Sequence, residues 1–288
     1  MGHASTCGRY FPMLASTRWS NLVKARLAEM QRLDPDRARV GPDFWDTRAK
    51  RFAAAMAGTA ERDPLLARLR QATGRRSTVL DVGAGPGRFS LAIAPRVKRV
   101  VAVDSSAVMV GIVAKRARQL KLANLEGVVG AWPDVTVDPA SVSVCSYVLP
   151  LVADAKRFLR RLDACTTERA FLYLGAASLD FLTDPMWRHF HGRPRRPGPT
   201  YLDAVAVLAE LGLDAEVEVV ELPTRARHQS LNAAVKAYAD QLLLPDDASV
   251  RRELRGLLSA WLVEDEGGLR PPVRTTPAAI VSWRPAGN

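Results

Sequence analysis

Cysteine is scarce in this chain. Only Cys7, Cys145 and Cys165 occur among its 288 residues, and no two of them stand at Cys-x-x-Cys spacing. An odd number of widely separated cysteines makes neither a disulfide framework nor a zinc knuckle. We therefore expect no disulfide scaffold and no metal site, and a reducing cytoplasm fits this composition.

Long apolar runs are missing as well. No stretch approaches the roughly 20 apolar residues that a membrane helix needs. Arg9, Arg18 and Lys24 occur near the N-terminus with no apolar signal core between them. The hydrophobic content of 48% still suffices for a sizeable core. The sequence predicts a soluble, cytoplasmic protein with no membrane partner.

Acidic residues are outnumbered by basic ones, and the formal net charge is +11. Residues 1–200 hold 32 Lys and Arg against 17 Asp and Glu, whereas residues 201–288 hold 9 against 13. A basic surface attracts nucleic acid, phosphorylated small molecules or acidic lipid without distinguishing among them. An arginine-rich proteome gives the same excess. The charge therefore leaves RNA open as a partner without identifying it.

The first quarter of the chain carries helical patterns. Residues 17–33 and 43–57 read as amphipathic helices, separated by turn-rich sequence around residues 34–36 and 41–42. A third helix is expected over 63–72. We predict that residues 1–75 form an N-terminal helical cap.

After residue 75, short β-branched runs alternate with helical patterns, which is typical of βαβ units. The expected helices cover 88–95, 106–121, 153–164 and 201–212. The expected strands cover 78–82, 99–104, 125–129, 141–147, 170–174, 215–221 and 278–283. The sequence predicts an α/β fold over residues 76–288: a Rossmann-like, seven-stranded, mostly parallel sheet with helices on both faces.

Two connections are too long for plain turns, at residues 175–200 and 222–272. The second contains helical patterns at 231–243 and 248–263. The first contains a basic loop, Gly192–Pro199, which includes three arginines. Long insertions between sheet elements usually carry function or cover a site, so we expect both to form a helical lid.

The strongest local pattern is a buried strand that runs into a glycine-rich turn and a helix, over residues 79–89. Glycines let the backbone approach a ligand and adopt conformations that a Cβ forbids. A dinucleotide fingerprint would need glycine at position 88, where this chain has arginine. Asp81 would repel a pyrophosphate but favour a cationic aminoacyl group.

At these residues the chain resembles the class I S-adenosylmethionine-dependent methyltransferases, whose first motif reads acid-x-Gly-x-Gly-x-Gly at the end of the first strand. The resemblance implies that Asp81 lies by the methionine amino group of S-adenosyl-L-methionine. It also implies that the turn wraps the methionine part of this cofactor. The residues so assigned are Asp81, Gly83, Ala84, Gly85 and Gly87.

A second acid should end the next strand, because a carboxylate can accept hydrogen bonds from both ribose hydroxyls. Asp104 stands there, 23 residues after Asp81, and is followed by Ser105. We assign both to the cofactor site. A strand-terminal Asp can instead be a helix N-cap, although Ser105 or Ser106 could also serve as that cap.

The third strand offers less. Many family members place an acid after it against the adenine amino group, but this chain has Ala131. Trp132 could flank the adenine face instead, or simply pack in the core. We assign Trp132 to the cofactor site, and from the expected helix 43–57 also Trp45 and Arg48, which the resemblance places over the cofactor.

The fourth strand ends where enzymes of this class face the methyl acceptor. No Asn-Pro-Pro-Tyr-type tetrapeptide of amino-group methylases follows it, and Cys145 lacks the Pro-Cys context of cytosine C5 enzymes. Cys145 is therefore interpreted as a small buried residue. Tyr147 is a candidate catalytic residue because its phenol can position or deprotonate a substrate group.

His189 and His191 are two further candidates for acid, base or substrate-positioning roles. They stand in a Pro-Met-Trp-Arg-His-Phe-His-Gly segment that is similar to one of a bacterial methyltransferase subgroup with no assigned substrate. Two residues apart, they would share one face of a strand, but a third metal ligand is not evident. The alternative is that both are solvated loop histidines.

These observations lead to one hypothesis and two alternatives. The chain is expected to transfer a methyl group from S-adenosylmethionine to an unidentified acceptor, most simply a small molecule held under the built-in lid. An RNA methyltransferase is the first alternative, supported by the basic loop and the charge excess. A non-catalytic S-adenosylmethionine-binding regulator is the second alternative, and it is left open by the absence of the acid that contacts adenine in many family members.

Overall fold

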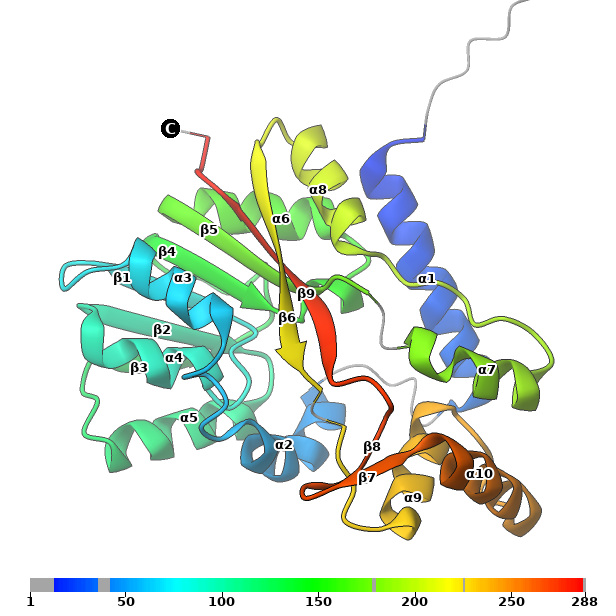
Figure 1. Cartoon of the computed structure of the whole chain (residues 1–288). Helices are drawn as coiled ribbons and strands as arrows, with labels where there is room; N and C mark the ends of the chain where they lie inside the picture. The colour runs from blue at the N-terminus through cyan, green and yellow to red at the C-terminus, as the bar shows by residue number, and fades with distance from the viewer. Residues whose placement is uncertain (1–12, 36–41, 178–179, 225, 287–288) are drawn as a thin grey trace, which may run out of the picture.

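The computed structural model describes residues 13–35, 42–177, 180–224 and 226–286. Within these ranges, seven strands form one sheet in the order β3-β2-β1-β4-β5-β9-β6, and this confirms the predicted Rossmann-like α/β fold (Figure 1). The strands are β1 (Thr78–Val82), β2 (Arg99–Asp104), β3 (Leu125–Val129), β4 (Ala140–Ser146), β5 (Thr166–Gly175), β6 (Ala215–Pro223) and β9 (Thr275–Trp283).

The sheet is parallel from β3 to β5, and β9 alone runs antiparallel to both of its neighbours. The central strands β1 and β4 are valine-rich and buried almost throughout, as expected for strands covered on both faces. From β1 the chain proceeds to β2 on one side, whereas β4 leads to β5 on the other. Ligands of open α/β sheets bind at such a switch point, beyond the carboxyl ends of the strands.

Helices cover both faces of the sheet and create two cores. On one face, α6 (Ala155–Ala164) and α8 (Tyr201–Glu210) pack around Phe158 and Trp283. On the other face, α4 (Arg88–Ile93) contributes Phe89 to a second core, and α5 (Ala107–Gln119) lies against β2 and β3. Two short 3₁₀ turns, Ala94–Arg96 and Leu149–Leu151, complete these layers.

The three N-terminal helices lie at three different places. Helix α1 (Ala15–Leu33) packs on α8 and α6, and its Trp19 is buried in the first core. Helix α2 (Pro42–Met56) contacts α5, and α3 (Pro64–Ala72) contacts α4. The division of the chain at residue 75 stays a prediction.

The two long connections form a third core. Helices α9 (Leu231–Gln241) and α10 (Ala248–Trp261) occupy the second connection as predicted, followed by a hairpin of β7 (Val263–Asp265) and β8 (Gly268–Arg270). The first connection contains α7 (Asp180–His191), which the sequence analysis did not predict. These elements gather at the C-terminal end of α1, whose Met30 and Leu33 pack against the third core (Figure 1). In the described part of the chain, no helix is long and apolar enough to cross a bilayer.

Candidate functional site

A cleft of about 520 Å³ opens where β1, β2 and β4 end. Its floor is the turn after β1, one wall comes from α2, and the opposite wall comes from the segments that follow β3 and β4. Of the predicted cofactor residues, the lining includes Asp81, Gly83, Ala84, Gly85, Asp104, Ser105, Trp132 and Trp45. The chain thus brings residues from six separate segments to one place.

The glycine-rich turn has the backbone shape that the motif requires. Gly83, Gly85 and Gly87 have φ values of 71°, 54° and 80°, a region that favours glycine. A Cβ on Gly83 would lie 2.2 Å from Val148 Cγ2, so no other residue fits there. A Cβ on Gly85 would meet only Phe52, at 3.7 Å, because this glycine faces the open cleft.

Asp81 lies at the base of the cleft and is 2% exposed. Ser90 Oγ donates a hydrogen bond of 2.5 Å to its Oδ2. Burial, opposed by the hydrogen bond from Ser90 and aided by the negative charge of Asp104, raises the pKa of Asp81 to about 6. A buried carboxylate with one hydroxyl donor retains strong attraction for a cation, as an aminoacyl ligand would supply.

Asp104 fastens the turn to the second strand. Its Oδ2 accepts from Gly85 N at 2.8 Å, and its Oδ1 accepts from Ser106 N at 2.9 Å. Burial raises the pKa of Asp104 despite these two amides. The N-cap of α5 is Ser106, whose Oγ accepts from Met109 N at 3.0 Å, so Asp104 is not needed as the cap. Each carboxylate oxygen keeps a second lone pair that can face a ligand.

Helix α2 forms one wall. Its cleft-facing stripe is Trp45, Phe52 and Met56, and the rings of Trp45 and Phe52 lie 5.7 Å apart. Asp46 accepts a hydrogen bond from Ser106 Oγ and so ties this wall to α5. Arg48 does not line the cleft, contrary to prediction. Successive residues of an α-helix are rotated by 100°, so Arg48 lies beside the stripe and not on it. Its guanidinium stacks over the Phe44 ring at 3.9 Å.

The opposite wall contains Trp132. Its ring packs edge-on against Phe158, and its Nε1 donates to the Phe158 carbonyl at 3.2 Å. The indole is therefore both part of the packing and part of the lining, so the two interpretations of Trp132 are compatible. Ala131 also lines the cleft and offers no carboxylate.

Tyr147 stands at the end of β4 with a φ of 59°, which is uncommon for a residue with a side chain. Its backbone N–H donates to the Tyr173 carbonyl at 2.8 Å, and its exposed ring lines the cleft. Strained backbone of this kind is found at functional sites. Cys145, by contrast, is fully buried, and burial raises the pKa of its thiol to about 12, so it is not a thiolate at neutral pH.

The structure contradicts the placement of His189 and His191 at the site. Both lie on α7, a helix rather than a strand, and neither lines the cleft. His189 pairs with Glu253 of α10 at 2.7 Å, and His191 Nε2 lies 2.8 Å from the Leu242 carbonyl. These contacts fasten α7 to the third core and engage both side chains outside the cleft. Gly87 is also outside the lining and serves as the N-cap of α4.

The basic loop after α7 is engaged in internal contacts. Arg193 and the backbone N–H of Arg196 both bind Glu29, a carboxylate of α1 that is 2% exposed, at 2.8 and 2.9 Å. Arg195 pairs with Asp180 and stacks over the Trp187 ring at 4.0 Å. Burial lowers the pKa of Arg195. The loop therefore joins α1 to α7, and two of its three arginine side chains are already paired.

Sequence reasoning missed several lining residues. Phe52 and Met56 follow Trp45 at helical spacing of seven and eleven residues, and that periodicity could have identified them. Met109, Leu151 and Phe158 line the cleft from elements whose packing no local pattern reveals.

Charge in the cleft is opposite to that of the whole chain. Its described lining carries two carboxylates, Asp81 and Asp104, and one cation, Arg88. Arg88 is already paired with the buried carboxylate of Asp63. The lining thus suits a ligand with a positive aminoacyl group and ribose hydroxyls, and the open side of Gly85 leaves room for its chain.

Comparison with known proteins agrees with this geometry. Residues 79–168, which include the turn and both acids, match a family model described as a methyltransferase domain. This match indicates a methyltransferase domain over residues 79–168. S-adenosylmethionine is accordingly the cofactor of this domain, and the residues just described fit it.

The proteins to which this chain is similar do not identify its methyl acceptor. An uncharacterized protein of Haemophilus influenzae is 28% identical over 183 residues, which cover 62% of this chain and 67% of the relative. Among solved structures, the YcgJ protein from Bacillus subtilis is similar, with a TM-score of 0.53 and 18% identity over 77% of this chain and 98% of its own. The [4+2]-cyclase SpnF has a TM-score of 0.55 and 14% identity, over 85% of this chain and 95% of its own. At these identities the two structures share the fold, and a fold by itself does not fix a reaction.

Proposed function

We propose that this protein is an enzyme that transfers the methyl group of S-adenosylmethionine to a small-molecule acceptor. The observation that carries the proposal is the cleft itself. It gathers Asp81, Asp104 and a glycine turn with three positive φ angles at the switch point of the sheet. A methyltransferase needs those groups in that place.

Each part of the cleft has a role in this proposal. Asp81 would hold the amino group of the cofactor, and Asp104 its ribose hydroxyls, with Ser105 beside them. The backbone at Gly83, Ala84 and Gly85 would lie along the methionine chain. Trp132 would flank the adenine together with Met109 and Phe158, an apolar setting that uses ring contacts in place of the missing acid. Trp45 would close the site from α2.

Catalysis then depends mainly on alignment. The bound sulfonium supplies an activated methyl group, so the protein has to orient the acceptor atom and exclude water. Phe52, Met56 and Leu151 provide the apolar surround. Tyr147 stands at the end of β4 facing the cleft, and we assign it to positioning or deprotonating the acceptor. With His189 and His191 away from the cleft, Tyr147 is the remaining catalytic candidate of the three.

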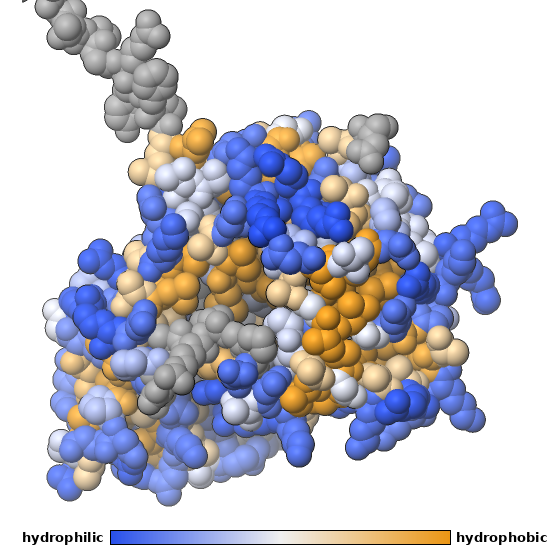
Figure 2. Space-filling model, turned by 180° about the vertical axis from the view of Figure 1, so that it is seen from behind, coloured by the Kyte–Doolittle hydropathy of each residue, from blue (hydrophilic) through white to orange (hydrophobic). Residues whose placement is uncertain are grey.

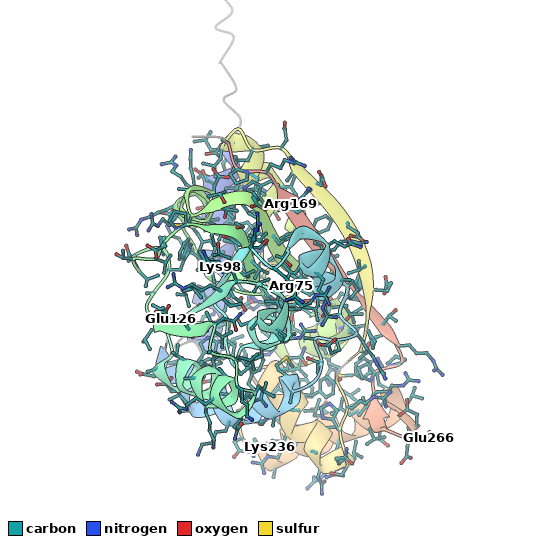
Figure 3. The ribbon with its side chains drawn as sticks, turned by 90° about the vertical axis from the view of Figure 1, so that its left-hand side faces the viewer. Arg75, Lys98, Glu126, Arg169, Lys236 and Glu266 are labelled. Carbon is teal, nitrogen blue, oxygen red and sulfur yellow. The ribbon has the colours of Figure 1, made fainter. Side chains whose placement is uncertain are left out.

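A small acceptor is favoured over RNA by the distribution of charge. Arg75, Lys98 and Arg169 lie on the side of the molecule where the parallel strands begin, away from the cleft (Figure 3). The back of the molecule is apolar toward its middle and hydrophilic at its periphery (Figure 2), which is unlike the continuous basic surface of RNA-binding proteins. With Arg193 and Arg195 also paired internally, the charge excess offers phosphate little near the site.

A cytoplasmic setting belongs to the same proposal, and it is supported by the free, buried thiols of Cys145 and Cys165. The non-catalytic regulator remains an alternative because Ala131 supplies no acid to adenine. Turnover decides between them.

The experiment is transfer of radiolabelled methyl from S-adenosylmethionine into fractionated cell extract. Small-molecule, RNA and RNase-treated fractions are assayed separately. Label in the small-molecule fraction is the expected result. Label that appears only in RNA and disappears after RNase overturns the small-molecule acceptor. Cofactor binding by calorimetry with no transfer into any fraction favours the regulator.

A further inference from the structure

A second cavity, the inner cavity, adjoins the cofactor cleft and has no role in the proposed function. It measures about 250 Å³, the space of roughly eight waters at about 30 Å³ each. Its walls come from α7, α9, α10 and the end of the β6–β9 pair. Two residues, Arg88 and Tyr147, line both this cavity and the cleft. The two spaces therefore meet at the tyrosine assigned to the acceptor.

Three aromatic rings line the inner cavity. Tyr147 stands at its mouth, and Tyr238 and Trp261 line it from α9 and α10 with their ring centroids 5.6 Å apart. Leu182 of α7 and Leu222 of β6 add apolar surface. Rings in offset or edge-on arrangements bind flat apolar molecules well. The wall chemistry favours a ring compound over a flexible polar chain.

The inner cavity offers no free charge. Among the described residues that line it, Arg88 alone carries one, and this guanidinium is paired with Asp63, whose side chain is fully buried. Arg88 also donates to Thr59 Oγ1 at 3.0 Å and lies over the Phe89 ring. A charged ligand would lose its hydration here without gaining a free counter-ion. The cavity selects against ionic molecules.

One polar group in the lining has no partner within the described residues. Thr224 Oγ1 is buried and makes no hydrogen bond, although its backbone N–H donates to the Arg274 carbonyl at 2.9 Å. A buried hydroxyl without a partner is costly, and a ligand hydroxyl would satisfy it. Burial also raises the pKa of Tyr238 to about 12, as expected in an apolar cavity.

From these features we propose that the inner cavity is the acceptor site, and that it takes an uncharged ring compound of small size that carries a hydroxyl group. The proposal rests on the proposed methyltransferase function and names its substrate class. The reacting group lies at the Tyr147 end, because methyl transfer requires the acceptor atom to face the cofactor cleft.

The test uses three ring probes of similar size: 2-naphthol, naphthalene and 2-naphthoate. Calorimetry or quenching of intrinsic fluorescence follows each probe at pH 7, with and without S-adenosylhomocysteine. We expect 2-naphthol to bind one to one, and the anionic 2-naphthoate to bind at least about tenfold more weakly. Equal or tighter binding of 2-naphthoate overturns the assignment to uncharged molecules.

Variants locate the probe. Ala226→Trp and Leu182→Trp add bulk to the cavity lining from two separate segments, and Ala206→Trp on an exposed face of α8 is the matched control. Both cavity variants should weaken 2-naphthol binding at least about tenfold, and the control should not. Thr224→Val keeps nearly the same shape but removes the hydroxyl, so it should reduce the preference for 2-naphthol over naphthalene about tenfold.

Unchanged 2-naphthol binding in both folded cavity variants overturns the site. S-adenosylhomocysteine binding is measured separately for every variant. If the wild-type protein binds the probe but not S-adenosylhomocysteine, the proposed function fails, and the cavity is a binding site for uncharged rings but not an acceptor site. If it binds S-adenosylhomocysteine but not the probe, the assignment fails and the proposed function stands.

Discussion

Individual backbone hydrogen bonds hold the glycine-rich turn of the cofactor site in place. Gly85 N donates to Asp104 Oδ2, and Gly83 N and Ala84 N both donate to the Val103 carbonyl, at 2.8 and 2.9 Å. The turn is therefore held by the strand that supplies the second acid. The motif order in the sequence predicted that Asp81 and Asp104 belong to one site, and both line the same cleft. The sequence did not predict that Arg88, in place of a third glycine, would form a buried ion pair with Asp63.

Replacing Gly85 tests the open side of the turn. Gly85→Val should abolish cofactor binding, because a branched side chain would enter the cleft at a φ of 54°. Gly192→Val is the matched control, since Gly192 has a φ of 65° with nothing near its Cβ position and lies outside the cleft lining. Calorimetry with S-adenosylhomocysteine should show loss in the first variant only. Equal binding by both would remove the turn from the cofactor site.

Asp104 is tested by a change that keeps its volume. Asp104→Asn should weaken cofactor binding by about 1 to 3 kcal/mol, because the neutral amide is a poorer acceptor for two ribose hydroxyls. Asp138→Asn serves as the control, since Asp138 is exposed and distant in the sequence from the motif. Isothermal titration measures both. The role assigned to Asp104 is wrong if the two variants bind alike.

The raised pKa of Asp81 predicts opposite effects on stability and on binding. The native pKa of about 6 lies above the ordinary value near 3.9, so native protein holds a proton that unfolded protein releases between those values. Ionised Asp81 thus costs about 3 kcal/mol of stability at neutral pH, a cost that vanishes below about pH 4. Asp81→Asn should be more stable than wild type, and its advantage in free energy of unfolding should be larger at pH 7.5 than at pH 4.5.

Urea unfolding at the two pH values measures that gain. Cofactor affinity should move the other way: wild-type affinity falls as pH drops below about 6, because protonation removes the charge that attracts the amino group. The variant should bind weakly at both pH values. A wild-type affinity that is constant from pH 7.5 to 5 would contradict the amino-group role.

Among the elements, the strands of the sheet and helices α9 and α10 were predictable, whereas α7 and the β7–β8 hairpin were not. Strand β5 begins at Thr166, four residues before the predicted start, because its first residues are polar and lack the apolar run that marks a strand. Helix α7 was missed since Pro185 within it and the Gly-Pro-rich loop after it indicate a turn. Tertiary contacts with α1 and α10 stabilise α7, and these contacts are invisible to local patterns.

The link between α1 and α7 can be broken at the loop. Changing Arg193, Arg195 and Arg196 to alanine should destabilise the protein by about 3 kcal/mol, because the buried carboxylate of Glu29 then loses its arginine, whereas Asp180 keeps its pair with Arg26. The measurement is urea unfolding, with Arg251, Arg252 and Arg255 of α10, all exposed, as the control triple. If the loop instead contacts RNA, the triple variant keeps its stability and loses about 2 to 3 units of salt slope.

At the scale of the molecule, charge and chemistry are separated. The cleft lining holds Asp81 and Asp104, whereas Arg75, Lys98 and Arg169 lie where the parallel strands begin, on a side that also carries Glu126 (Figure 3). The overall charge was readable from the sequence, but this placement of the cations was not, because it depends on how the strands align. Cations on the side opposite the cleft can attract RNA without presenting it for reaction.

Changing Arg75, Arg76 and Lys98 to alanine tests this separation. If the protein binds RNA, the slope of the logarithm of its binding constant against the logarithm of salt concentration should fall in magnitude by up to about 3, since up to three phosphate contacts are removed. Cofactor affinity and label transfer into the small-molecule fraction should be unchanged. Filter binding across a salt series measures the slope. A parallel fall in methyl transfer would indicate that the acceptor itself binds the basic surface.

The position of α1 also has a consequence for synthesis of the chain. Ser16 at its start binds Glu210, a residue 194 positions later, at 2.8 Å. On a ribosome adding about 5 to 20 residues per second, roughly 10 to 40 s pass between these two residues. The Val152 carbonyl that accepts from Trp19 Nε1 is itself 133 positions later, and the core around Trp19 is complete only with α8. Helix α1 is therefore made early and packed late, and the nascent chain carries a tryptophan without its full core until then.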